Sequence, residues 1–233
     1  VPLKQAQLDT DPCYLEYEYI DGGSLAKLLA DRPTEAPALL AWAANIVKGL
    51  ARTVGAFHRL DPPIVHRDLK PANILLQRIP PDALHPDGIR LRIADFGIGG
   101  LAASQALEQT RAGSTTRGEL LVTSLRGSHT PHYASPQQAR GDPPDVRDDV
   151  HALGVIWYQM LTGDLTSGVG PDLTTDLADL GADDKTIDLL RQCVSAKAER
   201  RPEDAAELAS LIDSLGGVGP KPRPGPKEPW NGE

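Results

Sequence analysis

The sequence is short of cysteine, of long apolar runs and of positive charge. Its two cysteines, Cys13 and Cys193, stand far apart, which argues against a disulfide framework and fits a reducing cytoplasm. No apolar run approaches the roughly 20 residues needed to span a bilayer, so we expect a water-soluble segment without membrane contact. The 24 Lys and Arg stand against 32 Asp and Glu, a formal net charge of −8. This balance argues against nucleic acid or anionic membrane as the main partner.

Methionine is scarcer still. Met160 is the only one, and the chain begins with Val1, so we expect a piece of a longer protein. A length of 233 residues allows one large domain or two small ones. The stretch 216–233 is rich in proline and glycine and cannot bury a core, so we expect a linker there.

A short polar loop carries the most informative pattern of the chain. It lies between two apolar runs within Ile64–Leu76, and its Asp68, Lys70 and Asn73 are spaced two and three residues apart. Phosphoryl transfer uses a carboxylate that orients the hydroxyl nucleophile, an ammonium that steadies the phosphate oxygens and an amide oxygen that holds a metal ion. The three residue types and their spacing therefore point to this chemistry.

Two strings of residues together resemble the protein kinase family. Residues 66–73 read H-R-D-L-K-P-x-N, and residues 95–97 read D-F-G after a further apolar stretch. The resemblance covers about residues 13–215. It implies an α+β, mainly α-helical fold, namely the large lobe of a protein kinase with a short β-hairpin at the catalytic cleft. His66 and Phe96 would be packing residues that set the loop and the Asp95 rotamer.

The resemblance assigns the chemistry residue by residue. Asp68 would accept or orient the proton of the substrate hydroxyl, and Lys70 would neutralise charge on the transferred phosphoryl group. Asn73 and Asp95 would bind the Mg²⁺ that bridges the phosphates of ATP, since hard cations take oxygen ligands. Lys70 followed by Pro71 favours the serine/threonine class. A chance polar loop is the plain alternative, and the second string argues against it.

The stretch before this loop predicts a strand and a turn. Cys13–Ile20 alternates and is rich in aromatic and β-branched residues, which predicts a strand. Asp21–Gly23 breaks it, and Ser24 can cap a short helix over Leu25–Ala30. The resemblance makes this the last strand of the small lobe running into the hinge. An ordinary strand and glycine turn is the plain alternative.

If this is the hinge, several of its groups would surround the nucleotide. Tyr17 would take the gatekeeper position. The carbonyl of Glu18 and the amide of Ile20 would meet the adenine edge, and Ser24 would lie near the ribose. Leu75 would lie under the adenine ring, although a core leucine explains this residue equally well from the sequence alone.

Apolar periodicity predicts the main helices. Residues at three- and four-residue steps predict a long amphipathic helix over Pro37–Leu60 that holds the polar loop. Asp149–Leu161 carries no charge after its first residue, so a helix there must be buried nearly all round. By the resemblance, Asp149 would accept backbone amides of the catalytic loop; a plain N-terminal cap is the alternative. Two more helices are expected at Thr186–Cys193 and Pro202–Leu215, and a β-hairpin at Ile74–Leu76 with Leu91–Ala94.

From Gly97 to Thr130 the chain loses its period and gains Gly, Ser and Thr, which is uncommon at this length unless the loop is functional or disordered. The resemblance makes it the activation segment, with Thr130 beside the acceptor hydroxyl. The segment closes at Gln137, where the family has a Glu that pairs with an Arg in the place of Arg201. Gln137 can form a neutral hydrogen bond with Arg201 instead of an ion pair, so we expect the end of the activation segment to be anchored slightly less tightly.

Arg67, directly before Asp68, suggests control by phosphorylation. In the family such an Arg meets a phosphate on the activation segment through charge-assisted hydrogen bonds that order the loop. The candidate acceptors are Ser114, Thr115, Thr116, Thr123, Ser124 and Ser128, of which the last three stand nearest to Thr130.

Several parts of the family pattern are absent from this sequence. No G-x-G-x-x-G precedes the hinge, no strand Lys is present to hold the α/β phosphates, and no helix Glu pairs with it. We therefore expect residues 1–22 to hold the last small-lobe strand and hinge, and residues 23–215 the large lobe. Either the sequence is truncated or the parent lacks the small lobe, and the isolated chain should have little activity.

The resemblance implies a cytoplasmic serine/threonine protein kinase, similar to bacterial members of the family. Its cofactors would be ATP and Mg²⁺, and its partner a protein substrate with a Ser or Thr acceptor. A kinase-like scaffold (pseudokinase) that binds protein partners is the first alternative, although such scaffolds usually lose Asp68, Asn73 or Asp95. A small-molecule kinase is the second, and the segment end at Thr130–Gln137 counts against it.

Overall fold

The computed structural model describes residues 1–7, 14–29, 35–82, 88–95 and 131–215. Helices dominate, and the strands form two separate antiparallel pairs. In chain order the elements are β1 (Leu3–Gln7), β2 (Tyr14–Tyr17), α1 (Leu25–Leu28), α2 (Ala36–His58), β3 (Ile74–Arg78), β4 (Ile89–Ile93), α5 (Pro136–Ala139), α6 (Val146–Thr162), α7 (Leu173–Asp179), α8 (Asp184–Cys193) and α9 (Ala205–Ser214).

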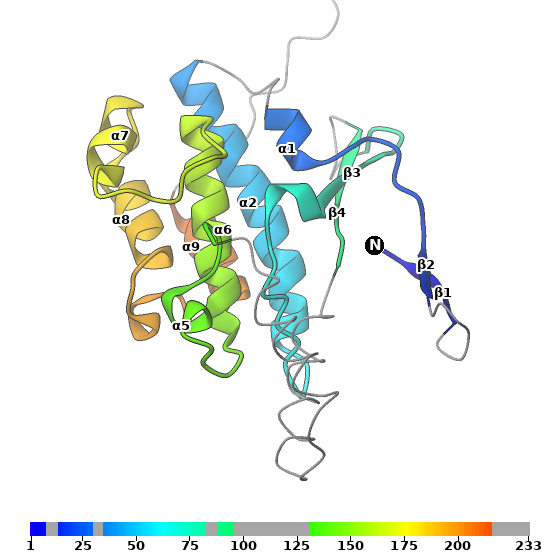
Figure 1. The fold of residues 1–233 in the computed structure, drawn as a ribbon. Coiled ribbons are helices and arrows are strands. Elements are labelled where there is room, and N and C mark those ends of the chain that lie inside the picture. The colour runs from blue at the N-terminus through cyan, green and yellow to red at the C-terminus, as the bar shows by residue number, and fades with distance from the viewer. Residues whose placement is uncertain (8–13, 30–34, 83–87, 96–130, 216–233) are drawn as a thin grey trace, which may run out of the picture.

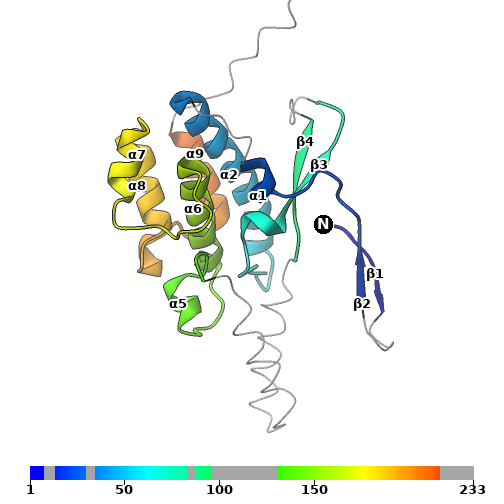
Figure 2. The same cartoon turned by 45° about the horizontal axis from the view of Figure 1, so that its top comes forward.

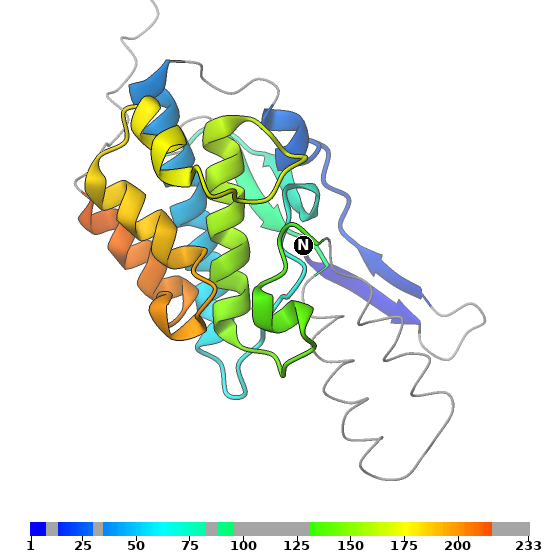
Figure 3. The same ribbon diagram turned by 60° about the vertical axis from the view of Figure 1, so that its left-hand side comes forward.

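Helix α6 is the centre of the helical part. It lies between α2 and α8 in two views (Figures 1 and 2), and Figure 3 shows it in front of α2. It contacts α2, α8 and α9. All its residues from Asp148 to Leu161 are buried, as its uncharged sequence predicts. The helix starts at Val146, three residues before the predicted start, because Asp145 caps it: the Asp145 carboxylate accepts a hydrogen bond from the Arg147 amide at 2.8 Å.

The β3–β4 hairpin lies between the helices and the N-terminal strands (Figure 2). Its register pairs Ile74 with Ile93, which brings the catalytic loop and the end of β4 to the same end of the hairpin. The predicted hairpin is confirmed, with both strands longer than expected at the connection. The segment before α1 crosses β3 so closely that a Cβ on Gly22 would lie 2.0 Å from the Leu76 carbonyl oxygen, so only glycine fits there.

The N-terminal strands differ most from the sequence predictions. β2 covers Tyr14–Tyr17 only, and it pairs with β1, which the sequence did not predict. The register shifts between Leu3 and Gln5, so side chains do not alternate evenly along β1 and period-two patterning fails there. The short helices α5 and α7 were also not predicted. No helix in the described residues is both long and apolar enough to cross a membrane.

Helices α2 and α9 touch through a glycine. A Cβ on buried Gly55 would lie 2.5 Å from the Ala206 backbone nitrogen, whereas a Cβ on exposed Gly49 of the same helix would meet nothing within 4 Å. We expect Gly55→Ala to lower the free energy of unfolding by about 1–3 kcal/mol, because backbone must move to admit the methyl group. The matched change Gly49→Ala should raise it by up to about 1 kcal/mol through helix propensity.

Urea denaturation of the two variants checks this packing. Equal and small effects of the two substitutions would contradict the close approach of α2 and α9.

Candidate active site

Three predicted side chains meet at the catalytic loop. The Lys70 Nζ donates to both carboxylate oxygens of Asp68, at 2.8 and 3.1 Å. The Asn73 Nδ2 donates to the Asp68 carbonyl at 2.9 Å and to its Oδ2 at 3.0 Å. Because both partners of Nδ2 are oxygens, the orientation of the Asn73 amide is determined. The Asp68 carboxylate is therefore held by two donors while its side chain stays 30% exposed.

The catalytic loop is held by hydrogen bonds to Asp149, a buried carboxylate on α6. The Asp149 Oδ2 accepts a hydrogen bond from the His66 amide, and its Oδ1 accepts one from the Arg67 amide, both at 2.8 Å. Arg67 has a left-handed backbone, with φ of 64°, which a non-glycine residue adopts only where its surroundings impose it. The expected role of Asp149 toward the loop is thus seen in the contacts, and the alternative of a plain cap is wrong because Asp145 caps α6.

His58 supports the same carboxylate from the last turn of α2. Its Nδ1 accepts a hydrogen bond from the Ala205 amide at 3.3 Å, and its Nε2 lies 2.9 Å from the Asp149 Oδ2. A backbone amide is only a donor, so the proton of a neutral His58 must be on Nε2, which donates to Asp149. The sequence pattern does not mark out His58, because this residue lies within the helix, 91 residues from its partner.

His66 joins the loop to the strand that carries Asp95. Its Nδ1 accepts from the Asp68 amide at 3.3 Å, so its Nε2 donates to the Ala94 carbonyl at 2.9 Å. The Ala94 amide in turn donates to the Asn73 carbonyl at 2.8 Å. His66 is buried, which agrees with the packing role expected for it. These bonds fix the backbone on both sides of the proposed metal site.

Asp95 follows β4 at the end of the hairpin where Asn73 precedes β3. It is exposed and has a left-handed backbone, with φ of 56°. Within the described residues its carboxylate has no hydrogen bond or ion pair, and no group of three His, Cys, Asp or Glu forms a metal site there. One carboxylate and the amide oxygen of Asn73 are nevertheless hard oxygen donors of the type that Mg²⁺ takes, with water and phosphate oxygens completing its shell.

The segment predicted as the hinge lies against β3. Ser24 forms a β-bridge with Leu75, and the Leu76 amide donates to the Gly23 carbonyl at 2.9 Å. Leu75 is partly exposed, and within the described residues the Glu18 carbonyl and the Ile20 amide have no hydrogen-bond partner. Ser24 is the first residue before α1, but its hydroxyl makes no capping bond, so that part of the prediction is wrong.

The closing anchor of the activation segment is present. The Arg201 Nη2 donates to the Gln137 Oε1 at 3.1 Å, while its Nε and Nη1 donate to the carbonyls of Ser195 and Arg147. Burial lowers the pKa of Arg201, and the charge of Asp148 opposes that shift. The Gln137 Nε2 is buried without a partner in the described chain. The pairing expected for Gln137 is confirmed, with one orphaned donor.

Other predicted residues lie outside the described residues. They are Phe96, Ser114, Thr115, Thr116, Thr123, Ser124, Ser128 and Thr130.

A cavity separate from the catalytic loop adjoins the end of the activation segment. It has a volume of about 490 Å³, and its lining includes His132, His151 and Arg191 but neither Asp68 nor Asn73. His151 is 9% exposed, and its Nδ1 lies 3.3 Å from the Tyr133 carbonyl, to which it donates. Burial lowers the pKa of His151 to about 4; the charge of Arg201 acts in the same direction and the Tyr133 contact opposes it.

This buried histidine makes the fold acid-sensitive. Its pKa is about 4 in the folded chain and 6.5 ordinarily, so between these values the unfolded chain binds more protons and stability falls as pH falls. From pH 7 to pH 5 His151 should cost about 2 kcal/mol of unfolding free energy. We expect His151→Gln, which can still donate to Tyr133, to remove that part of the pH dependence. Urea denaturation at both pH values measures it, and identical pH dependence in the two proteins would contradict it.

The chain matches known proteins over most of its length. A family described as "Protein kinase domain" matches residues 1–231. The serine/threonine-protein kinase PknA of Corynebacterium glutamicum is 30% identical over 227 residues, which cover 91% of this chain and 41% of that protein. PknB of Mycobacterium leprae is 33% identical over 152 residues, covering 65% of this chain and 20% of that protein. The chain thus spans less than half the length of the curated relatives it matches.

The fold also matches solved structures. The crystal structure of the Mycobacterium tuberculosis PknI kinase domain superposes with a TM-score of 0.58 at 19% identity, over 88% of this chain and 66% of that one. With the family match over residues 1–231, this likeness in fold leads to one conclusion: the chain belongs to the protein kinase domain family.

Proposed function

We propose that this chain carries the catalytic loop of a serine/threonine protein kinase, which transfers the γ-phosphoryl group of ATP to a Ser or Thr hydroxyl of a protein substrate. The observation that carries the proposal is the convergence of the Lys70 ammonium and the Asn73 amide on the Asp68 carboxylate. The relatives named as serine/threonine-protein kinases support the substrate class.

Each side chain has a distinct task in this proposal. The Asp68 carboxylate accepts the proton of the substrate hydroxyl and directs its oxygen toward the γ-phosphorus. The Lys70 ammonium, held 2.8 Å from that carboxylate, lies where charge on the transferred group needs compensation.

Mg²⁺ and ATP would lie at the open end of the hairpin. The Asn73 Oδ1 and the Asp95 carboxylate would hold the ion, which when bound draws negative charge from the β- and γ-phosphate oxygens. The Glu18 carbonyl and the Ile20 amide would bind the adenine edge, with Leu75 under the ring and Ser24 near the ribose. These two backbone groups have no hydrogen-bond partner among the described residues, which together with the partial exposure of Leu75 supports this arrangement.

The proposal applies to the full-length protein. The glycine-rich loop that holds phosphates in this family is not found in this sequence before the hinge, so we propose little turnover for the isolated chain.

An assay of the full-length protein with Mg-ATP and a protein acceptor tests the role of Asp68. We expect Asp68→Asn to lower kcat by at least about a hundredfold, because the amide cannot accept the proton. The KM for ATP should change little, since Asp68 contacts the acceptor and not the nucleotide. The control is Asp188→Asn on α8, whose exposed carboxylate pairs with Arg191.

Retained turnover in Asp68→Asn would overturn the role of this carboxylate. A full-length protein that binds Mg-ATP without any turnover would favour the scaffold alternative instead.

A further inference from the structure

Arg67 reaches from the catalytic loop to the start of α6. Its Nε lies 3.4 Å from the Asp148 Oδ2, and its Nη2 donates to the Asp142 carbonyl at 3.2 Å. The side chain is only 13% exposed. Its own carbonyl accepts a hydrogen bond from the Gln138 Nε2 at 2.6 Å. The Nε–H is buried without a hydrogen-bond partner in the described residues, so Arg67 and Asp148 form an ion pair and not a hydrogen bond. Arg67 is thus held at its backbone and at Nη2, and its charge is paired with Asp148.

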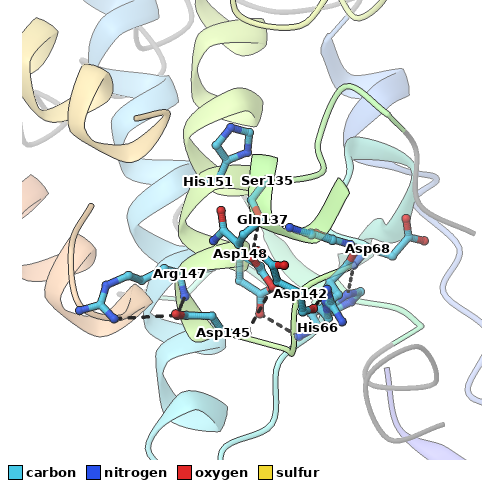
Figure 4. A network of polar contacts seen from close by, with 12 residues as sticks. His66, Asp68, Ser135, Gln137, Asp142, Asp145, Arg147, Asp148 and His151 are labelled. Atoms are coloured by element: carbon cyan, nitrogen blue, oxygen red, sulfur yellow. Dashed lines mark hydrogen bonds and ion pairs between the residues drawn. The ribbon is translucent and has the colours of Figure 1, made fainter. Parts of the chain in front are cut away.

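Asp148 joins three separate parts of the chain. Its side chain is fully buried. The Oδ1 accepts a hydrogen bond from the Ser135 Oγ at 2.5 Å, in the end of the activation segment, and the Oδ2 accepts one from the Asp145 amide at 3.3 Å. The same Oδ2 faces Arg67. Figure 4 shows Asp148 between Ser135, Asp145 and the catalytic loop.

The charge of Asp148 needs a partner at this depth. Burial raises the pKa of Asp148, whereas the Ser135 hydroxyl and the positive charge of Arg67 lower it. Arg201 also faces this carboxylate, but its guanidinium donates to Gln137 and two carbonyls. An uncompensated buried charge is costly, so removing either member of the Arg67–Asp148 pair exposes the other to that cost.

We propose that Asp148 is the resident counter-ion of Arg67 and a positioning residue for the catalytic loop. By pairing with the charge of the guanidinium it helps to hold Arg67, and with it the adjacent Asp68, in place without a phosphate on residues 96–130. This inference rests on the proposed kinase function and specifies its regulation: phosphorylation of the activation segment is not required for turnover. Asp148 touches neither substrate nor nucleotide, so it acts through Arg67.

The test compares phosphorylated and dephosphorylated full-length protein. The protein is treated with a phosphatase, its phosphate content is read by intact mass, and kcat is measured. We expect the wild type to keep at least half of its kcat. Asp148→Asn, which preserves shape but removes the charge, should lose at least tenfold in kcat after dephosphorylation and recover part of it when phosphorylated, with little change in KM for ATP.

Asp142→Asn is the matched control. Arg67 contacts the Asp142 carbonyl, and the Asp142 carboxylate pairs with exposed Arg140 instead. This variant should therefore behave like the wild type in both states of phosphorylation.

Two kinetic results would overturn the inference. One is a wild type that loses more than tenfold in kcat on dephosphorylation. The other is an Asp148→Asn variant whose kcat is the same as that of the wild type. An Asp148→Asn variant whose kcat falls equally with and without phosphate, and whose thermal unfolding midpoint falls as well, would also overturn it, because a merely structural residue would behave in this way.

A second measurement needs no turnover and separates this inference from the kinase assignment. The Arg67 Nε–H signal of the present chain, identified by its loss in Arg67→Lys, should shift in the NMR spectrum of Asp148→Asn, because the carboxylate charge lies 3.4 Å from that nitrogen. A wild type without turnover in which this shift is seen would overturn the proposed function and support the pair. A signal at the same position in Asp148→Asn would overturn the pair.

Discussion

The hydrogen bonds from the Asp149 carboxylate to the His66 and Arg67 amides are the constraint on which the candidate site depends. Hydrogen bonds to a charged group contribute roughly 1.5–3 kcal/mol each, which is enough to hold Arg67 in its left-handed conformation, a strain of about 1–3 kcal/mol. With the backbone fixed there, Asp68 comes next along the chain and meets Lys70 and Asn73.

Asp149 can do this only because α6 is buried all round. Its helix packs between α2 and α8, and His58, from the end of α2, donates to the carboxylate while accepting from the first amide of α9. Three helix ends therefore converge behind the loop. The adjacent Asp148 faces the side chain of Arg67 and the end of the activation segment. Of these two consecutive carboxylates, Asp149 thus binds the backbone of the loop and Asp148 pairs with the charge of its Arg67 side chain.

The sequence predicted the long elements and the local part of the site. Apolar periodicity located α2, α6, α8 and α9, and Asp68, Lys70 and Asn73 were predicted together because they lie within six residues of one another. The pairing of Gln137 with Arg201, 64 residues away, came only from the family resemblance. Strand β1 was not predicted, because its register shift breaks the alternation of side chains that marks a strand. No role was predicted for Asp148, because the helix dipole already explains an acidic residue at the start of a helix. Only the fold shows that Asp148 faces Arg67.

Hydrogen exchange at the His66 and Arg67 amides tests the central claim most directly. In the wild-type chain both amides should be protected, as donors to one buried carboxylate. In Asp149→Asn only one oxygen remains, so at least one of the two amides should exchange at least about tenfold faster. Fast exchange of both amides in the wild type, or unchanged protection in the variant, would show that the loop is held by something other than Asp149.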